Sequence, residues 1–331
     1  MARVITILNQ KGGVGKTTTV VNLGAYLAFL GKTTLVVDLD PQFNATIGLG
    51  VRHAERETIY HALIGEIDVK SAVRATSLAN LDIVPSSPDL SGALVELLDM
   101  PDRNERLRNV LEPLRDEYDF ILIDLGPSLN VLTLNGLLAS DEVLIPVQCE
   151  YFSLEGIHQL LKTVELVKKN LGHPIKISGA LLTMYDKREK LSREMAREIR
   201  KRFPYRVYDI AIPQSVALAE SPSFRRPVML HAPQSSGALA YEALAKEIVG
   251  GIPAESRADA YDFGADAEST QNDAERTLNG AGDAEAEDEP FSLQTLKNDI
   301  ARVEELTSVE AELREPEPFL LIDFSTEEDK G

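Results

Sequence analysis

The sequence has 331 residues but a single cysteine, no tryptophan and no long apolar run. One cysteine, Cys149, excludes an internal disulfide framework and any zinc or iron–sulfur cluster that needs several thiolates. The apolar run from Met1 to Leu8 is too short for a signal peptide, and no stretch approaches the roughly 18 apolar residues of a membrane span. These absences favour a soluble, cytoplasmic protein.

Basic residues are scarce only at the C-terminal end. The whole chain carries 53 acidic and 34 basic residues, a net charge of −19. From residue 251 onward there are 23 acidic and 6 basic residues, so residues 1–250 are close to neutral. The overall acidity therefore describes the C-terminal segment, and it does not exclude a body that binds nucleic acid.

Apolar, β-rich runs alternate with patterns of helical period between residues 3 and 250. Continuous apolar strands separated by helices predict an α/β fold with a doubly wound, mainly parallel sheet covered on both faces. The predicted strands are 4–8, 34–37, 81–84, 120–123, 143–147 and 177–183, and the clearest helices are 16–30, 154–170 and 191–203.

The composition changes near Gly251. We expect a globular body over residues 1–252, then an acidic linker over 253–290 with too few large apolar side chains to fold. Apolar residues return at helical spacing over 291–315, which predicts an amphipathic helix. The acidic tail, 316–331, contains a short apolar motif, Phe319–Phe324.

The strongest motif is a glycine-rich turn between a predicted strand and a predicted helix. Its glycines let backbone N–H groups turn toward phosphate oxygens, and the helix N-terminus adds positive potential. Lys16 is placed to reach the outer phosphates, and the Thr17 hydroxyl to ligate Mg²⁺. The expected phosphate-binding residues are Lys11, Gly12, Gly13, Val14, Gly15, Lys16, Thr17 and Thr18.

A second lysine stands at the mouth of this loop. In the pattern G-x-x-x-x-G-K-T the first glycine would fall at Gln10, and Lys11 follows it instead. Two lysines serving one triphosphate from the same side would be redundant. Lys11 is either a solvated surface lysine or a residue that reaches a nucleotide held by a second subunit, and the loop alone does not decide between the two.

Three carboxylates end strands that should lie beside the loop. Asp124 follows four apolar residues, a position from which a carboxylate contacts Mg²⁺ directly or through water. Asp38 and Asp40 end another strand, where they could order an attacking water or hold magnesium. The alternative is that these acids cap neighbouring helices.

The loop K-G-G-V-G-K-T-T resembles the deviant Walker A motif of the ParA/Soj/MinD ATPases. The segment Val36–Gln42 resembles their switch I, and Phe120–Asp124 resembles their Walker B strand. Asn135–Leu137, Pro146–Gly156 and 182–186 resemble the Soj-type chromosome partitioning proteins in particular. The resemblance covers about residues 2–250 and leaves out the acidic segment.

This resemblance implies a P-loop NTPase that hydrolyses ATP with Mg²⁺ and dimerises on ATP. Lys11 would cross the dimer to the partner's phosphates, and Asp40 would position the hydrolytic water. The implied catalytic residues are then Lys11, Lys16 and Asp40, with Thr17 and Asp124 at the metal. Met184, Asp186 and Pro213 would lie near the adenine.

Basic side chains gather over residues 187–206. Arg193, Arg197 and Arg200 fall on one helix face, and we expect the face of Leu191, Met195 and Ile199 to enter the core. The family resemblance implies sequence-independent DNA binding here, for which the candidate residues are Arg188, Arg193, Arg197, Arg200, Arg225 and Arg226. The alternative is a solvated helix with ion pairs such as Glu189–Arg193.

The sequence also departs from the Soj pattern. Gln214 and Ala217 stand where that pattern has arginines, the second of which Soj-type proteins use on DNA. Phe43 replaces the usual glycine of switch I. Leu125-Gly126-Pro127 replaces Cys-Pro-Pro. We expect nucleotide chemistry to survive these changes, whereas DNA affinity and the timing of hydrolysis depend on them.

The first functional hypothesis is a ParA/Soj-like ATPase that binds nucleoid DNA and partitions a chromosome or plasmid with a ParB-like partner. The alternative is the same ATP-driven dimer positioning a protein cargo. A synthetase of the same loop family is a third option, but no motif for its substrate pocket is present. The acidic helix would be repelled by anionic lipid, which argues against a membrane partner. The tail either docks on an unknown partner or competes with DNA for the basic face.

Overall fold

The computed structural model describes residues 1–52, 56–150 and 153–250. An eight-stranded sheet forms the centre, in the order β3-β4-β2-β5-β1-β6-β7-β8. The pairs are parallel except for the short antiparallel pair of β3 and β4. The strands are β1 (Arg3–Ile7), β2 (Thr34–Leu39), β3 (Arg74–Ala75), β4 (Leu81–Val84), β5 (Phe120–Leu125), β6 (Glu142–Gln148), β7 (Lys176–Tyr185) and β8 (Val207–Pro213).

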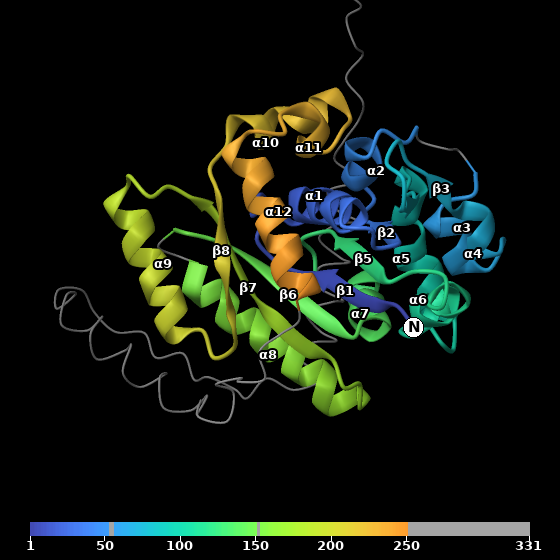
Figure 1. The fold of residues 1–331 in the computed structure, drawn as a ribbon. Helices are drawn as coiled ribbons and strands as arrows, with labels where there is room; N and C mark the ends of the chain where they lie inside the picture. The colour runs from blue at the N-terminus through green and yellow to red at the C-terminus, as the bar shows by residue number, and fades with distance from the viewer. Residues whose placement is uncertain (53–55, 151–152, 251–331) are drawn as a thin grey trace, which may run out of the picture. The chain divides into compact units, whose positions relative to one another are not determined.

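Helices cover both faces of the sheet (Figure 1). One layer contains α1 (Lys16–Phe29), α2 (Asn44–Gly48), α10 (Val216–Glu220), α11 (Val228–His231) and α12 (Ser236–Val249). The other contains α3 (Ile59–Ile64), α4 (Val69–Ala72), α5 (Ala93–Glu96), α6 (Arg106–Leu111), α7 (Val131–Ala139), α8 (Ser153–Leu171) and α9 (Lys190–Arg202). Short 3-10 turns are η1 (Pro88–Ser91), η2 (Leu97–Asp99), η3 (Glu112–Leu114) and η4 (Ser221–Phe224). The predicted doubly wound α/β fold is confirmed.

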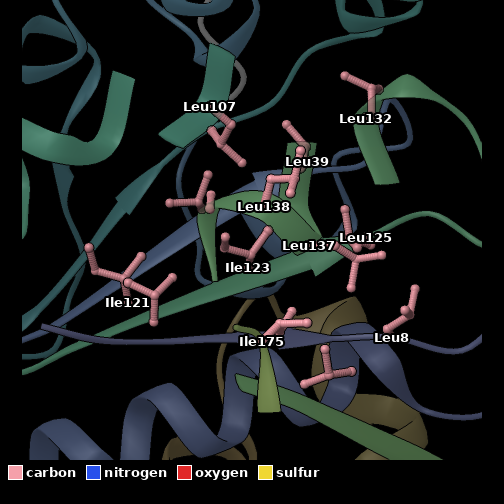
Figure 2. Packing of buried hydrophobic residues seen from close by; sticks show 14 of the residues in the cluster. Leu8, Leu39, Leu107, Ile121, Ile123, Leu125, Leu132, Leu137, Leu138 and Ile175 are labelled. Atoms are coloured by element: carbon pink, nitrogen blue, oxygen red, sulfur yellow. The ribbon is translucent and has the colours of Figure 1, made fainter. Parts of the chain in front are cut away.

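The central strands are apolar throughout because both of their faces are buried. On β5, Ile121 and Ile123 enter the core beneath α3–α9, while Phe120 and Leu122 enter the core beneath α1 and α12. Each such fully buried side chain contributes about 1.5–3 kcal/mol. Figure 2 shows the first of these cores, in which strand residues meet Leu107, Leu132, Leu137 and Leu138.

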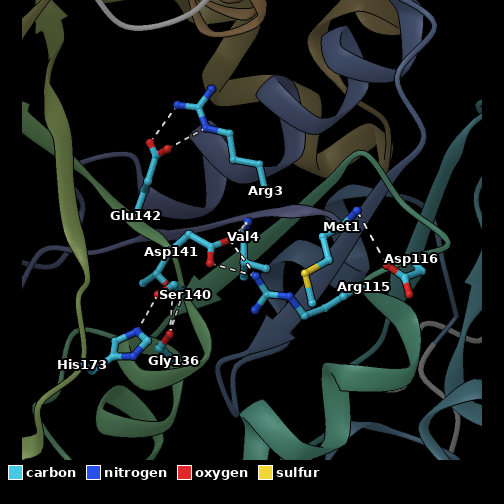
Figure 3. A network of polar contacts seen from close by, with 11 residues as sticks. Met1, Arg3, Val4, Arg115, Asp116, Gly136, Ser140, Asp141, Glu142 and His173 are labelled. Carbon is cyan, nitrogen blue, oxygen red and sulfur yellow. Dashed lines mark hydrogen bonds and ion pairs between the residues drawn. The ribbon is translucent and has the colours of Figure 1, made fainter. Parts of the chain in front are cut away.

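Polar contacts tie β1 to β6 at the end of the sheet where these strands begin (Figure 3). The Asp141 carboxylate accepts hydrogen bonds from the Val4 N–H at 2.8 Å and from Arg115 at 2.8 and 2.9 Å. Arg3 donates two hydrogen bonds to Glu142, at 2.8 and 2.7 Å. Such bidentate, charge-assisted pairs fix orientation as well as adding energy. The opposite, carboxyl end of these strands is left for the loops.

The predicted strands and helices all appear, with boundaries that differ by a few residues, but β3 and β8 were not predicted. The predicted core face of α9 was wrong at one position, since Leu191 is 52% exposed. The buried stripe consists of Ser192, Ala196 and Ile199. Small side chains at the first two positions let the helix approach β7, which leaves the neighbouring Leu191 outside.

Gly179 on β7 offers a test of this packing. Its φ is +149°, and a Cβ added there would lie 2.9 Å from the Arg206 carbonyl oxygen and 3.2 Å from the Tyr208 ring. We expect Gly179→Ala to lower the free energy of unfolding by about 2–4 kcal/mol, because backbone strain and a backbone clash add together.

The control is Gly172→Ala. Gly172 also has a positive φ, +64°, but its Cβ would meet nothing within 4 Å among the described residues. Gly172→Ala should lower the free energy of unfolding by only about 1 kcal/mol. Chemical denaturation of both variants measures the difference, and equal losses would contradict the proposed contact with the Arg206 carbonyl.

Candidate nucleotide site

The carboxyl ends of three adjacent strands meet at one edge of the sheet. Asp124 on β5 lies in register with Ile7 on β1 and with Asp38 on β2. The glycine-rich loop continues from β1 into α1, so the loop and the carboxylates share this edge. Open α/β sheets bind ligands at this edge, where loops and helix N-termini converge.

The loop after β1 is shaped by glycines in the left-handed region. Gly13 has φ +73° and Gly15, which precedes α1, has φ +90°. A Cβ at Gly12 or Gly13 would meet nothing within 4 Å in the described part of the chain, so space remains in front of the loop. Backbone N–H groups arranged in this way form an anion-binding concavity.

The two lysines of the loop point in different directions. Lys16 is 7% exposed, and its Nζ donates to the Lys11 carbonyl at 3.3 Å. Burial lowers the pKa of Lys16, although Asp124 and Asp40 nearby favour its charged form. Lys11 instead reaches the surface, where its Nζ lies 2.8 Å from Glu150 and 3.2 Å from the Gln148 side-chain oxygen.

Asp124 is a fully buried carboxylate at the end of β5. Neither of its oxygens has a hydrogen-bond partner among the described residues. Burial and the neighbouring Asp38 raise its pKa well above the usual value, whereas Thr17 and Lys16 oppose the shift. An orphaned carboxylate beside a threonine hydroxyl provides the hard oxygen ligands that Mg²⁺ prefers, so the residues present fit this metal.

Asp38 has a different role because its oxygens are already occupied. One oxygen accepts hydrogen bonds from the Thr46 N–H at 2.8 Å and the Thr46 hydroxyl at 2.7 Å, and the other accepts from the Asp40 N–H at 3.3 Å. Burial raises the pKa of Asp38 to about 6, and these donors hold it below a still higher value. Asp38 therefore binds an N–H in the first turn of α2, as a residue that caps this helix would, although Phe43 is the N-cap residue.

Asp40 follows the end of β2 and is 9% exposed. Its carboxylate accepts the Gln42 N–H at 3.0 Å. A Cβ added to Gly126 would lie 3.5 Å from the carboxylate carbon, in ordinary van der Waals contact, so the glycine leaves room for a small group beside Asp40. Phe43, where the resemblance has glycine, adopts φ +44°. A non-glycine residue in this region carries about 1–2 kcal/mol of strain.

The ends of β7 and β8 form the far side of the same edge. Thr183 donates to the Val14 carbonyl at 2.9 Å, which fastens β7 to the loop. Met184 follows with φ +51° and 40% exposure. Pro213 on β8 pairs in register with Tyr185. The structure therefore brings Met184 and Pro213 to one edge.

Asp186 comes just after β7 and is held by Arg188. The Arg188 guanidinium lies 2.7 Å from the carboxylate, and hydrogen bonds from Arg188 hold the pKa of Asp186 down to about 2. Two of the residues predicted from the sequence thus contact each other, although they were assigned to different ligands.

The arginines of α9 are partly bound to backbone carbonyls. Arg193 donates to the Lys187 and Arg188 carbonyls, and Arg200 to those of Tyr208 and Asp209. Arg193, Arg197 and Arg200 line a hollow of about 370 Å³ together with Tyr185 and Asp209. Arg225 and Arg226 follow η4 in the other helical layer, so the structure does not join them to α9.

Several residues of this edge escaped the sequence analysis. Asn9 donates to the Pro146 carbonyl at 2.7 Å and accepts the Lys11 N–H at 3.0 Å, which fixes the start of the loop. Thr46 and Ser86 contact the segment between Asp38 and Asp40. Short polar residues after strands are too common for their spacing to single them out.

Comparison with known proteins gives a consistent result. A family model described as an AAA domain matches residues 2–177. The sporulation initiation inhibitor protein Soj of Bacillus subtilis is 50% identical over 249 residues, which cover 75% of this chain and 98% of that protein. The chromosome-partitioning ATPase Soj of Treponema pallidum is 49% identical with the same coverage. The chain belongs to the Soj/ParA family of partitioning ATPases.

Solved structures of similar proteins contain bound nucleotide. A Mycobacterium smegmatis protein, described as cobyrinic acid a,c-diamide synthase, contains ADP and magnesium in one structure. It is 35% identical, with a TM-score of 0.67 over 75% of this chain and 94% of its own. A second structure of it contains an ATP analogue and magnesium. The cell division ATPase MinD of Pyrococcus furiosus is 30% identical, with a TM-score of 0.63 over 76% and 99%.

Family membership makes this chain an ATP-hydrolysing enzyme, as its loop predicts, and the related structures agree with the expected cofactors ATP and Mg²⁺. Within the described residues, no helix is both long enough and apolar enough to cross a membrane. The amphipathic helix predicted at 291–315, and the linker and tail beside it, lie outside the described residues.

Because the carboxylate of Asp124 is buried without a hydrogen-bond partner among the described residues, we expect its charge to lower the free energy of unfolding when magnesium is absent. Without nucleotide or metal, we expect Asp124→Asn to raise the free energy of unfolding by about 1–3 kcal/mol at pH 8, because the variant has no buried charge to desolvate. The folded-state pKa of Asp124 lies above its unfolded value, so wild-type stability falls as the pH rises above about 4. The gain should therefore shrink at pH 5.

Thermal and chemical unfolding at the two pH values measure this effect. Magnesium with ATP should stabilise the wild type more than Asp124→Asn. Asp119→Asn is the contrasting variant, because hydrogen bonds from Thr33 lower the pKa of Asp119 and its replacement should lower stability. If Asp124→Asn were less stable than the wild type at pH 8, the prediction that the buried charge of Asp124 destabilises the metal-free protein would be wrong.

Proposed function

We propose that this chain is a DNA-associated partitioning switch that dimerises on ATP and dissociates after hydrolysis. The observation that carries the proposal is the divergence of the two loop lysines. Lys16 turns into its own site, whereas Lys11 is 47% exposed and extends from the rim of that site. A second copy facing this edge would meet Lys11, so ATP held between two copies would receive a lysine from each.

The residues of one site have separable roles in this proposal. Lys16 and the loop N–H groups bind the outer phosphates, and Thr17 and Asp124 hold magnesium, whose charge offsets that developing on the phosphates. Asp40 orients the attacking water beside Gly126, where the glycine leaves room for a small group. The base is bordered by Met184, Asp186 and Pro213. In this proposal the ion pair of Asp186 with Arg188 breaks when the nucleotide binds, and Asp186 contacts the nucleotide instead.

The role of Lys11 is tested by Lys11→Ala. The variant should bind ATP with an affinity within about threefold of that of the wild type, because the Lys11 side chain points away from the site of its own chain. It should nevertheless remain a monomer with ATP. Sedimentation with ATP and Mg²⁺ measures the dimer, and a fluorescent ATP analogue measures binding.

Lys70→Ala is the matched control, since Lys70 is also an exposed lysine in a surface ion pair, with Glu117. It should dimerise normally. If Lys11→Ala dimerised as the wild type does, a role across the interface would be wrong and Lys11 would be a solvated surface residue.

We assign non-specific DNA binding to the ATP dimer, with α9 as the contact surface. The hollow lined by Arg193, Arg197 and Arg200 has the size and charge to receive backbone phosphates. Two copies of α9 in a dimer would double the contacts, and about six phosphate contacts lose roughly a thousandfold in affinity between low and physiological salt. Such binding would place the protein on the nucleoid.

Binding of the Asp40→Ala protein to a non-specific duplex tests this assignment. Asp40→Ala should hold the ATP dimer, so we expect tight binding with ATP and Mg²⁺ and little with ADP at physiological salt. Arg197→Ala in the same background should weaken binding about threefold to tenfold and lower the salt dependence. Arg108→Ala, an exposed arginine on α6, is the control and should change neither.

Absence of binding by a protein that still dimerises would favour the protein-cargo alternative. That alternative has its own support, because Gln214 and Ala217 stand where the Soj pattern has arginines. In either case we expect an activator, ParB-like for a DNA cargo, that speeds hydrolysis. Copurification of the activator with the ATP-bound dimer would identify the cargo.

A further inference from the structure

The segment that carries Asp40 is fixed by a closed set of buried hydrogen bonds. Asp38, Thr46 and Ser86 are each fully buried, and Asp40 is 9% exposed. They come from three places in the chain: the end of β2, the first turn of α2, and the loop after β4. Buried polar groups that satisfy one another in this way rigidify the segment they join.

The hydrogen bonds start at Ser86 and reach Asp38 by two branches, one through Asp40 and one through Thr46. The Ser86 hydroxyl donates to the Asp40 carbonyl at 2.8 Å. The Ser86 N–H donates to the Thr46 hydroxyl at 3.1 Å, and that hydroxyl donates to Asp38 at 2.7 Å. Asp38 in turn accepts the Asp40 N–H at 3.3 Å. Both backbone polar groups of Asp40 are therefore held by buried side chains.

The Asp40 side chain is held less firmly than its backbone. Among the described residues its carboxylate accepts only the local Gln42 N–H, at 3.0 Å, and the carbonyl of Asp40 also accepts the Phe43 N–H at 2.9 Å. The orientation of the carboxylate therefore depends on where the hydrogen bonds of Ser86 and Asp38 place the Asp40 backbone. Displacements of about 1 Å at a catalytic group can cost on the order of a hundredfold in rate.

We propose that Thr46 and Ser86 are positioning residues for ATP hydrolysis: Thr46 holds the Asp40 backbone through Asp38, Ser86 holds it directly at the Asp40 carbonyl, and together they set the carboxylate beside Gly126. This inference rests on the proposed role of Asp40. Both hydroxyls are fully buried and bind the segment that carries Asp40, so in this proposal they act through Asp40. Their loss should slow hydrolysis without weakening nucleotide binding or the ATP dimer.

The test compares Thr46→Val and Ser86→Ala, which remove one hydroxyl each. We expect kcat to fall about fivefold to tenfold in each, the loss typical of one hydrogen bond, with KM within about twofold of the wild type. Thr46→Ser keeps the hydroxyl and should retain at least about half of kcat. Ser86→Ala removes only one atom and keeps the experiment decisive if Thr46→Val folds poorly.

The matched controls are Thr6→Val and Ser140→Ala. These two hydroxyls are also fully buried and bonded to each other, at 2.5 Å, but they lie between β1 and α7 and not at switch I. They should lower stability by a similar amount and leave kcat unchanged. If the control variants lowered kcat as much as Thr46→Val and Ser86→Ala do, the effect would be a general loss of stability and the inference would be wrong.

Asp40→Ala separates this inference from the proposed function. If Asp40→Ala hydrolyses ATP at the wild-type rate, the proposed role of Asp40 fails. If Asp40→Ala is inactive but Ser86→Ala and Thr46→Val have wild-type kcat, only the positioning role fails. In the Asp40→Ala background, Ser86→Ala should change the residual rate less than twofold, and a further fivefold loss there would overturn action through Asp40.

Discussion

The buried carboxylate of Asp124 is the constraint on which the nucleotide edge depends. It lies near the end of β5 between two other parallel strands, and neither of its oxygens has a hydrogen-bond partner among the described residues. Lys16 and Thr17 are brought beside it because the glycine-rich loop leads from the end of β1 into the start of α1. The site is thus electrostatically incomplete by itself, and a divalent cation with a triphosphate supplies charges of the right sign and size.

The neighbouring aspartates show how burial and donors divide similar residues into different roles. Asp38 is saturated by Thr46 and the Asp40 N–H, so it stabilises switch I. The Asp40 carboxylate accepts only the Gln42 N–H among the described residues, and Gly126 leaves room for a small group beside it. Phe43 carries backbone strain close by, which favours a segment that changes conformation with the bound nucleotide.

Two ion pairs at the edge of the site join residues for which we propose other partners in the ATP-bound dimer. Lys11 contacts Glu150 in the single chain, and Arg188 contacts Asp186. Both ion pairs are at least half exposed on one side, so each contributes little stability and can be replaced at low cost. A nucleotide and a second copy are the partners that we propose for them, and these exchanges would couple the nucleotide state to the surface the dimer presents.

The sequence by itself determined the alternating α/β pattern, the phosphate loop, Asp124 and the family, because these depend on local spacing and on contiguous motifs. The residues alone left the roles of Asp38 and Asp40 and the directions of Lys11 and Lys16 open, and only the family resemblance distinguished them. The helical period placed Leu191 in the core, whereas it is exposed. Strand β8 was missed because its exposed edge interrupts the apolar run. Thr46 and Ser86 lie 40 residues apart and meet only through the pairing of β2 with β4. Only tertiary packing decides which donors reach a buried carboxylate.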